Sequence, residues 1–181
     1  MWIFGYGSLI WNPNFSYYAH RLARIDNWVR RFWQGSIDHR GVPGHPGRVV
    51  TLVSEPSGNC WGVAFNCGKS DNQQVIEDLD LREKGGYHRE SVTLNFTDGS
   101  TTQGLVYVAD PDNLDYLGPA DEIDIARQIL SAEGPSGSNL EYLSNLASAL
   151  RTLDVPDSHV FLIESKVQTL INTRPSASDL L

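Results

Sequence analysis

The sequence predicts an α+β fold, a small mixed β-barrel surrounded by helices. Strand patterns occupy the first two-thirds of the 181 residues, whereas helical patterns are inserted once and then gathered at the end. The strands are short and separated by turn residues, which favours a closed or half-closed barrel. The length favours one domain, which we place at residues 1–171, followed by a flexible C-terminal tail at 172–181.

The predicted strands begin at the N-terminus. Trp2–Tyr6 is the first, and Ala19–Ser36 is either one long strand or two short ones. Two apolar stretches, Arg48–Val53 and Cys60–Phe65, flank the turn residues Glu55–Asn59, which predicts a hairpin.

A second hairpin is predicted further along the chain. Val92, Leu94 and Phe96 alternate with polar residues and therefore share one strand face. Asp98-Gly99 then turns the chain into a strand at Leu105–Ala109.

Four helices are predicted from capping residues and helical spacing. The first has its cap at Ser70 and ends at Gly85-Gly86, and the second spans Ala120–Glu133. The third spans Ser138–Leu153, with Glu141 at the capping-box position. The fourth follows Asp157 and is expected to bury Val160, Ile163, Val167 and Leu170.

Composition and charge exclude several classes of protein. A net charge of −8 and a pI of about 5.0 disfavour a nucleic acid or an anionic membrane as the main partner. No apolar stretch approaches the ~20 residues of a membrane span, and the N-terminus lacks a signal-peptide pattern. Two cysteines, Cys60 and Cys67, are expected to be buried free thiols. We therefore expect a soluble, cytoplasmic protein.

Gly5-Tyr6-Gly7-Ser8-Leu9 interrupts a buried strand with two glycines. Glycines let the backbone turn sharply and approach a ligand closely, and consecutive N–H groups in such a turn can bind an anion. A bulge or tight turn without a ligand is the alternative. The spacing matches neither a dinucleotide fingerprint nor a Walker loop.

The glycine- and proline-rich stretch from Asp38 to Arg48 is predicted to be a long loop, either a lid over a substrate or a solvated surface loop. Asp38, His39 and His45 could be imagined as metal ligands, but their spacing matches no familiar zinc pattern. We predict no metal site.

Glu83 is the candidate for proton transfer. It lies at the C-terminus of a predicted helix, where the macrodipole disfavours an anion, so burial there would raise its pKa towards that of a general base. The alternative is a solvated helix end in which Arg82 and Lys84 are ordinary caps. Tyr142 could point its hydroxyl into a cleft or could simply pack. No nucleophile signature built on serine or cysteine is present.

Five segments together resemble the ChaC-type γ-glutamylcyclotransferases, which act on glutathione. They are FGYGSLIWNPNF at 4–15, RRFWQGSIDHRG at 30–41, PGRVVTL at 46–52, LDLREKGGY at 79–87 and GPSGSNLEYLSNL at 134–146. They fall in the order found in the family and span most of the chain. Asn14, where we expect glycine, and Ser138, where proline is common, depart from the pattern.

The resemblance implies a compact mixed barrel with helices around it, and a reaction without a cofactor. The α-amine of a γ-glutamyl unit attacks its own side-chain amide, forming 5-oxoproline and releasing cysteinylglycine. Glu83 matches the catalytic acid/base, and Tyr6-Gly7-Ser8-Leu9 matches the loop that holds the γ-glutamyl head group. Arg40 and Tyr142 are further candidates for substrate contacts.

Two alternatives to a glutathione-specific enzyme remain open at this point. One is a cyclotransferase that acts on other γ-glutamyl-amino acids or amines. The other is a non-enzymatic module that binds a small anion or a partner protein through the same loop. The sequence carries no signal of oligomeric state.

Overall fold

Five strands form a closed barrel in the order β1-β3-β2-β4-β5. The computed structural model describes residues 1–68, 72–82 and 85–173. Neighbouring strands are antiparallel except β1 and β5, which are parallel and close the barrel where Ile3 pairs with Leu105. The predicted mixed barrel is therefore confirmed. The strands are β1 (Trp2–Gly5), β2 (Ala19–Ser36), β3 (Gly47–Asn66), β4 (His88–Phe96) and β5 (Thr101–Val108).

The long strands β2 and β3 pair along almost their whole length. β2 is one strand with the predicted bounds, but the predicted hairpin at Glu55–Asn59 is wrong. Asp26 pairs with Asn59 and Trp28 with Ser54, so residues 55–58 bulge opposite Asn27 while β3 continues in the same direction. Both halves of β3 pair with the same strand, β2. Turn residues alone do not predict this pairing, because it depends on a strand elsewhere in the chain.

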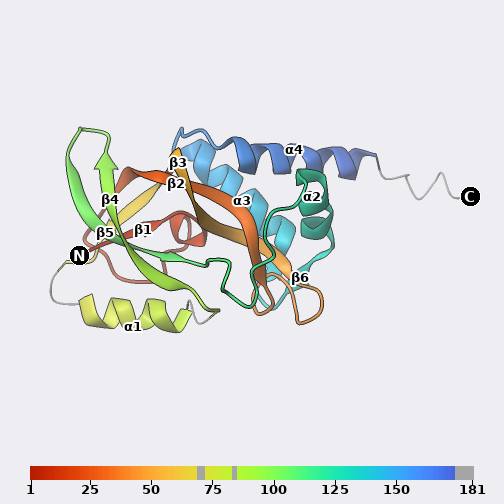
Figure 1. Ribbon diagram of the computed structural model, residues 1–181, viewed down its shortest axis with the longest axis horizontal. Helices are drawn as coiled ribbons and strands as arrows, with labels where there is room; N and C mark the ends of the chain where they lie inside the picture. The colour runs from red at the N-terminus through yellow and green to blue at the C-terminus, as the bar shows by residue number, and fades with distance from the viewer. Residues whose placement is uncertain (69–71, 83–84, 174–181) are drawn as a thin grey trace, which may run out of the picture.

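Helices cover the barrel on two sides (Figure 1). α1 lies beside the barrel, whereas α2, α3 and α4 pack against one another over the far ends of β2 and β3. The helical elements of the described residues are η1, a 3₁₀ turn (Ser8–Ile10), α1 (Asn72–Arg82), α2 (Glu122–Ser131), α3 (Asn139–Thr152) and α4 (Ser158–Asn172).

The predicted caps hold where the structure describes them. The Ser138 hydroxyl accepts a hydrogen bond from the Glu141 N–H, 3.2 Å away, and the Asp157 carboxylate accepts one from the Val160 N–H, 2.9 Å away. The predicted cap Ser70 lies outside the described residues.

The second helix is shorter than the predicted Ala120–Glu133. Asp121 and Ala132 both have extended backbones at its two ends. Glu133 instead enters a two-residue strand pair that the sequence did not predict, β6 (Glu133–Gly134) with β7 (Gly137–Ser138). This pair turns the chain directly into α3.

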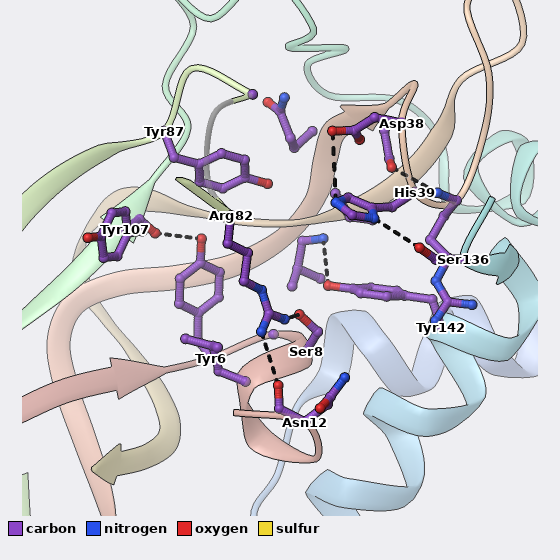
Figure 2. A pocket seen from close by; sticks show the side chains of 18 of the residues that line it. Tyr6, Ser8, Asn12, Asp38, His39, Arg82, Tyr87, Tyr107, Ser136 and Tyr142 are labelled. Carbon is purple, nitrogen blue, oxygen red and sulfur yellow. Dashed lines mark hydrogen bonds and ion pairs between the residues drawn. The ribbon is translucent and has the colours of Figure 1, made fainter. Parts of the chain in front are cut away.

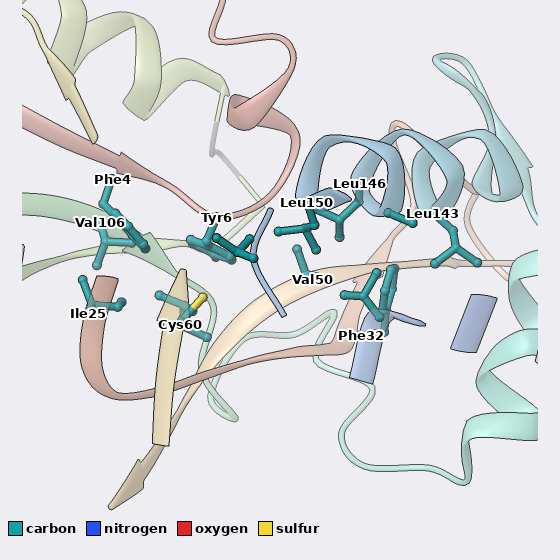
Figure 3. Close-up of a cluster of buried hydrophobic side chains, with 14 of the residues drawn as sticks. Phe4, Tyr6, Ile25, Phe32, Val50, Cys60, Val106, Leu143, Leu146 and Leu150 are labelled. Atoms are coloured by element: carbon teal, nitrogen blue, oxygen red, sulfur yellow. The ribbon is translucent and has the colours of Figure 1, made fainter. Parts of the chain in front are cut away.

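The hydrophobic core runs from the barrel interior to α3 (Figure 3). Phe4 and Ile25 lie within the barrel, whereas Phe32 packs near Leu143 of α3. Cys60 and Cys67 are buried free thiols, as predicted. Burial raises the pKa of Cys60 to about 11. Within the described ranges, no helix has the length and apolarity needed to cross a membrane.

Candidate functional site

A cavity of about 350 Å³ opens between the barrel and α3. Segments far apart in the sequence form its wall, including the turn after β1, the end of β2, the end of α1 and the start of α3. The predicted site residues Tyr6, Gly7, Ser8, Leu9, Arg40 and Tyr142 all line this cavity.

Both glycines of the first motif lie where a side chain would press on its neighbours. A Cβ atom on Gly5 would lie 2.8 Å from the Leu9 Cβ. A Cβ on Gly7 would lie 3.1 Å from both the Tyr142 hydroxyl and a methyl group of Val50. The absence of side chains therefore lets the chain turn from β1 into η1 while it touches α3 and β3.

The turn after β1 presents free N–H groups. The N–H groups of Trp11 and Asn12 both bond to the Ser8 carbonyl oxygen, at 3.2 and 2.9 Å. Those of Ser8 and Leu9 begin the 3₁₀ turn, and no acceptor in the described part of the chain engages them. The anion-binding concavity that the sequence predicts thus has donors available.

Arg82 connects α1 to this turn (Figure 2). Its Nη2 donates to the Ser8 Oγ at 2.7 Å, and its Nη1 donates to the Asn12 carbonyl oxygen at 3.2 Å. The contact places a guanidinium charge in the wall of the cavity beside the Ser8 hydroxyl. Two of the family motifs, 74 residues apart in the chain, are thereby joined.

Glu83, the predicted acid/base, lies outside the described residues. Arg82 and Gly85, which flank residues 83–84 in the sequence, both line the cavity. Gly86 has a φ of +81°, a left-handed conformation that matches the predicted helix end at two glycines. The role of Glu83 stays a prediction.

Tyr142 and Arg40 form the α3 side of the cavity. The Tyr142 hydroxyl accepts a long hydrogen bond from the Val50 N–H at 3.4 Å. The Arg40 guanidinium lies 6.0 Å from the centre of the Tyr142 ring, and its Nη1 donates to the Glu141 carboxylate at 2.8 Å. Because Glu141 already neutralises it, Arg40 offers less charge to a ligand than the sequence suggests.

The hydroxyl groups of Tyr6 and Tyr107, which both line the cavity, connect the turn after β1 to β5 and β5 to α1 by hydrogen bonds. Tyr6 donates to the Tyr107 carbonyl oxygen at 2.8 Å, and the Tyr107 hydroxyl donates to Asp80 of α1 at 2.7 Å. The Tyr6 carbonyl oxygen in turn accepts from Nε of the buried Arg30 at 2.7 Å. Tyr6, the first residue of the predicted substrate loop, is therefore held at both its side chain and its backbone.

The start of the predicted Asp38–Arg48 loop lines the cavity. His39 Nδ1 lies 2.9 Å from the Ser136 Oγ, and His39 Nε2 lies 3.9 Å from the Asp38 carboxylate (Figure 2). Among the residues that the structure describes, no group of three His, Cys, Asp or Glu could hold a metal ion. Whether this loop acts as a lid stays a prediction.

Asn14 explains one departure from the family pattern. Its φ is +57°, in the left-handed region where glycine is favoured and asparagine is the best tolerated alternative. Asn14 also lines the cavity.

The sequence did not single out Gln34, Tyr87, Tyr107 or Asp115, although all four line the cavity. Gln34 and Tyr87 lie within the segments that resemble the family, so those segments were a signal for them. No motif in the neighbouring sequence pointed to Tyr107 or Asp115. The fold alone brings these two residues to the cavity.

The comparisons with known proteins agree with one another. A family model described as ChaC-like protein matches residues 1–170. The chain is 44% identical to glutathione-specific gamma-glutamylcyclotransferase 1 of Danio rerio, over 94% of this chain and 90% of the relative. It is 36% identical to a glutathione-specific gamma-glutamylcyclotransferase of Schizosaccharomyces pombe, over 93% and 92%. A crystal structure of a yeast γ-glutamyl cyclotransferase specific to glutathione superposes with a TM-score of 0.88 at 29% identity, over 93% of this chain and 96% of that chain.

Proposed function

The chain belongs to the ChaC-like protein family, and on that basis we propose that it is a γ-glutamylcyclotransferase that cleaves glutathione to 5-oxoproline and cysteinylglycine. The names of relatives at 36–44% identity support the substrate. The observation that carries the proposal is the cavity in which the turn after β1 and the end of α1 meet, joined by Arg82 and Ser8.

The reaction is intramolecular, so the protein has no need to supply a nucleophile. The α-amine of the γ-glutamyl unit attacks the γ-carbonyl carbon, a five-membered ring closes, and the C–N bond to cysteine breaks. The amine is protonated at neutral pH and must lose a proton, while the departing nitrogen must gain one. One carboxylate can take the first proton and return it as an acid, and we assign this role to Glu83.

The turn after β1 supplies the binding half of the proposed site. The N–H groups of Ser8 and Leu9, together with Arg82, can hold the α-carboxylate or the oxyanion that develops on the γ-carbonyl oxygen. Holding the flexible γ-glutamyl chain in attack geometry is worth several kcal/mol, up to ~7–11 in ideal intramolecular cases. Tyr142 and Arg40 would contact the substrate from the α3 side.

The test is product formation. Purified protein should convert glutathione to 5-oxoproline and cysteinylglycine, measured by chromatography, with no added metal. Glu83→Gln should abolish turnover and leave the unfolding curve unchanged. Glu77→Gln, on the exposed face of α1, is the matched control and should remain active. An active Glu83→Gln variant would contradict the mechanism.

Substrate range and location are part of the same proposal. Comparing kcat/KM for glutathione, γ-glutamyl-amino acids and γ-glutamylamines tests whether glutathione is preferred. We propose a cytoplasmic location, with which the two buried free thiols are compatible. We also propose that residues 1–171 form a single domain.

A further inference from the structure

Gln34 carries a buried acceptor that no group among the described residues satisfies. It lies near the end of β2, lines the cavity and is only 1% exposed. Its Nε2 donates to the Gly35 carbonyl oxygen at 3.2 Å and to the Asn113 Oδ1 at 3.1 Å. Its Oε1 is buried and accepts no hydrogen bond from the described part of the chain. A buried acceptor without a partner is destabilising, and native proteins rarely leave one unless a water or a ligand satisfies it.

The orientation of this amide is fixed by backbone groups of known polarity. Asn113 Oδ1 accepts from the Asp115 N–H at 2.8 Å, and Asn113 Nδ2 donates to the Gly85 carbonyl oxygen at 2.6 Å. Flipping Asn113 would set an NH₂ group against an N–H and an oxygen against a carbonyl. Asn113 therefore presents an acceptor to Gln34, and Gln34 donates to it from its NH₂ group. Oε1 is left as the free atom.

The surroundings of Gln34 favour a cationic donor. Asp115 also lines the cavity, and its carbonyl oxygen accepts from the Gly35 N–H at 2.7 Å, so Gln34 and Asp115 belong to one wall. The cation Arg82 belongs instead to the turn that contains Ser8. A zwitterionic head group would thus find Asp115 and the Gln34 acceptor in one wall, and the Arg82 guanidinium and the backbone N–H groups of Ser8 and Leu9 in another.

We propose that Gln34 binds the α-amino group of the γ-glutamyl substrate through Oε1, and that Asn113 is the positioning residue that fixes this orientation. The inference rests on the proposed function, because it takes a γ-glutamyl compound as the ligand. Oε1 is buried in the cavity wall, so neighbouring groups must move slightly before the ligand can reach it. A neutral amide can hold both the ammonium and the free amine, and it does not compete for the proton.

The test compares two ligands in the wild type and in Gln34→Met, which keeps the length of the side chain and removes the acceptor. Glutathione is the substrate, and glutaryl-cysteinylglycine, which lacks the α-amino group and cannot cyclise, is the competitive inhibitor. Loss of a hydrogen bond to a charged group should lower kcat/KM for glutathione about 10-fold or more. The inhibition constant of the analogue should stay within about twofold, which also shows that the cavity is intact.

A second pair of variants tests the positioning residue. Asn113→Leu removes the acceptor that orients Gln34, so its KM for glutathione should rise by about the same factor as in Gln34→Met. Asn113→Asp keeps an acceptor for both the Gln34 amide and the Asp115 N–H but loses the donor to the Gly85 carbonyl oxygen, so its KM should rise less than that of Asn113→Leu. Equal increases in the two Asn113 variants would overturn the positioning role.

Other outcomes separate this inference from the proposed function. Gln103→Met, on the exposed side of β5, is the control and should leave both constants unchanged. An unchanged kcat/KM in Gln34→Met, or an inhibition constant that rises in parallel, would overturn the contact with the amine. A wild-type protein that forms no 5-oxoproline would instead contradict the proposed function.

Discussion

Arg82, the last residue of α1, donates a hydrogen bond from Nη2 to the Oγ of Ser8 at 2.7 Å. The same guanidinium also reaches the Asn12 carbonyl oxygen. One side chain therefore fixes the end of a helix against the turn that follows β1. In the proposed enzyme, these two segments carry the acid/base and the head-group contacts, so their relative placement decides whether the substrate reaches both.

Arg82→Lys should separate this placement from stability. A lysine ammonium is a point donor that cannot span two acceptors as the planar guanidinium does. We expect kcat/KM for glutathione to fall about 10-fold, while the free energy of unfolding in urea changes by less than about 1 kcal/mol, because the contact is only partly buried. Arg127→Lys, exposed on α2, is the control. Equal kinetic losses in both variants would contradict a specific role for Arg82.

Gly7→Val should impair substrate binding more than folding. The new Cβ would press on the Tyr142 hydroxyl and on Val50, each 3.1 Å away, and its branches would enter the cavity. We expect KM for glutathione to rise at least 10-fold, with Gly7→Ala intermediate, and stability to fall by about 1–2 kcal/mol. Normal activity per folded molecule together with a collapse in stability would show that the turn is purely structural.

Local signals in the sequence predicted much of the fold. The caps Ser138 and Asp157 act within one helical turn, so they could be identified from neighbouring residues alone. β2 is rich in apolar and aromatic residues with interleaved arginines, and its bounds matched the prediction, which left open whether it was one strand or two. The bulge at residues 55–58 could not be distinguished from a hairpin, because its identity depends on pairing with β2.

The site was predictable only in part, for the same physical reason. Tyr6–Leu9 and Tyr142 lie in segments with recognisable patterns, and the structure brings them to one cavity. The contact between Gln34 and Asn113 spans 79 residues and that between Asn113 and Gly85 spans 28. No local pattern in a single sequence encodes such contacts, so the contacts emerged only from the fold.

Asp157→Asn should destabilise the protein through a buried charge. The Arg30 guanidinium is almost fully buried and donates to the second oxygen of the Asp157 carboxylate. Asparagine can keep the helix cap through Oδ1, but its NH₂ group would then face the Arg30 guanidinium, so the variant removes both the compensating charge and the acceptor for Arg30. We expect the free energy of unfolding to fall by about 3 kcal/mol, measured in urea. Asp121→Asn, at the exposed start of α2, should change it by less than about 0.5 kcal/mol.

The same variant should also affect substrate binding. Arg30 holds the Tyr6 carbonyl oxygen at 2.7 Å, directly before Gly7. If its guanidinium shifts when Asp157 is neutralised, KM for glutathione should rise in the folded fraction. A stability equal to that of the wild type would show that Tyr6 and Trp61, whose carbonyl oxygens also bind Arg30, suffice to hold it.

His159 should make stability depend on pH between about 6.5 and 4. Burial lowers its pKa to about 4, with a further contribution from Arg31, and its Nε2 accepts a hydrogen bond from the Phe32 N–H at 3.1 Å. Asp157 and Glu122 oppose this shift without cancelling it. Below pH 6.5 the imidazole binds a proton in the unfolded chain but stays neutral in the folded chain. The contribution of His159 to the free energy of unfolding is therefore complete above pH 6.5 and is lost as the pH falls towards 4. The loss between pH 7 and pH 5 should be roughly 2 kcal/mol.

Urea unfolding of the wild type and of His159→Gln measures this loss. The difference in free energy of unfolding between the two proteins should become smaller as the pH falls. His45→Gln, an exposed control, should follow the wild type at every pH. A constant gap between the wild type and His159→Gln would show that His159 does not titrate on unfolding.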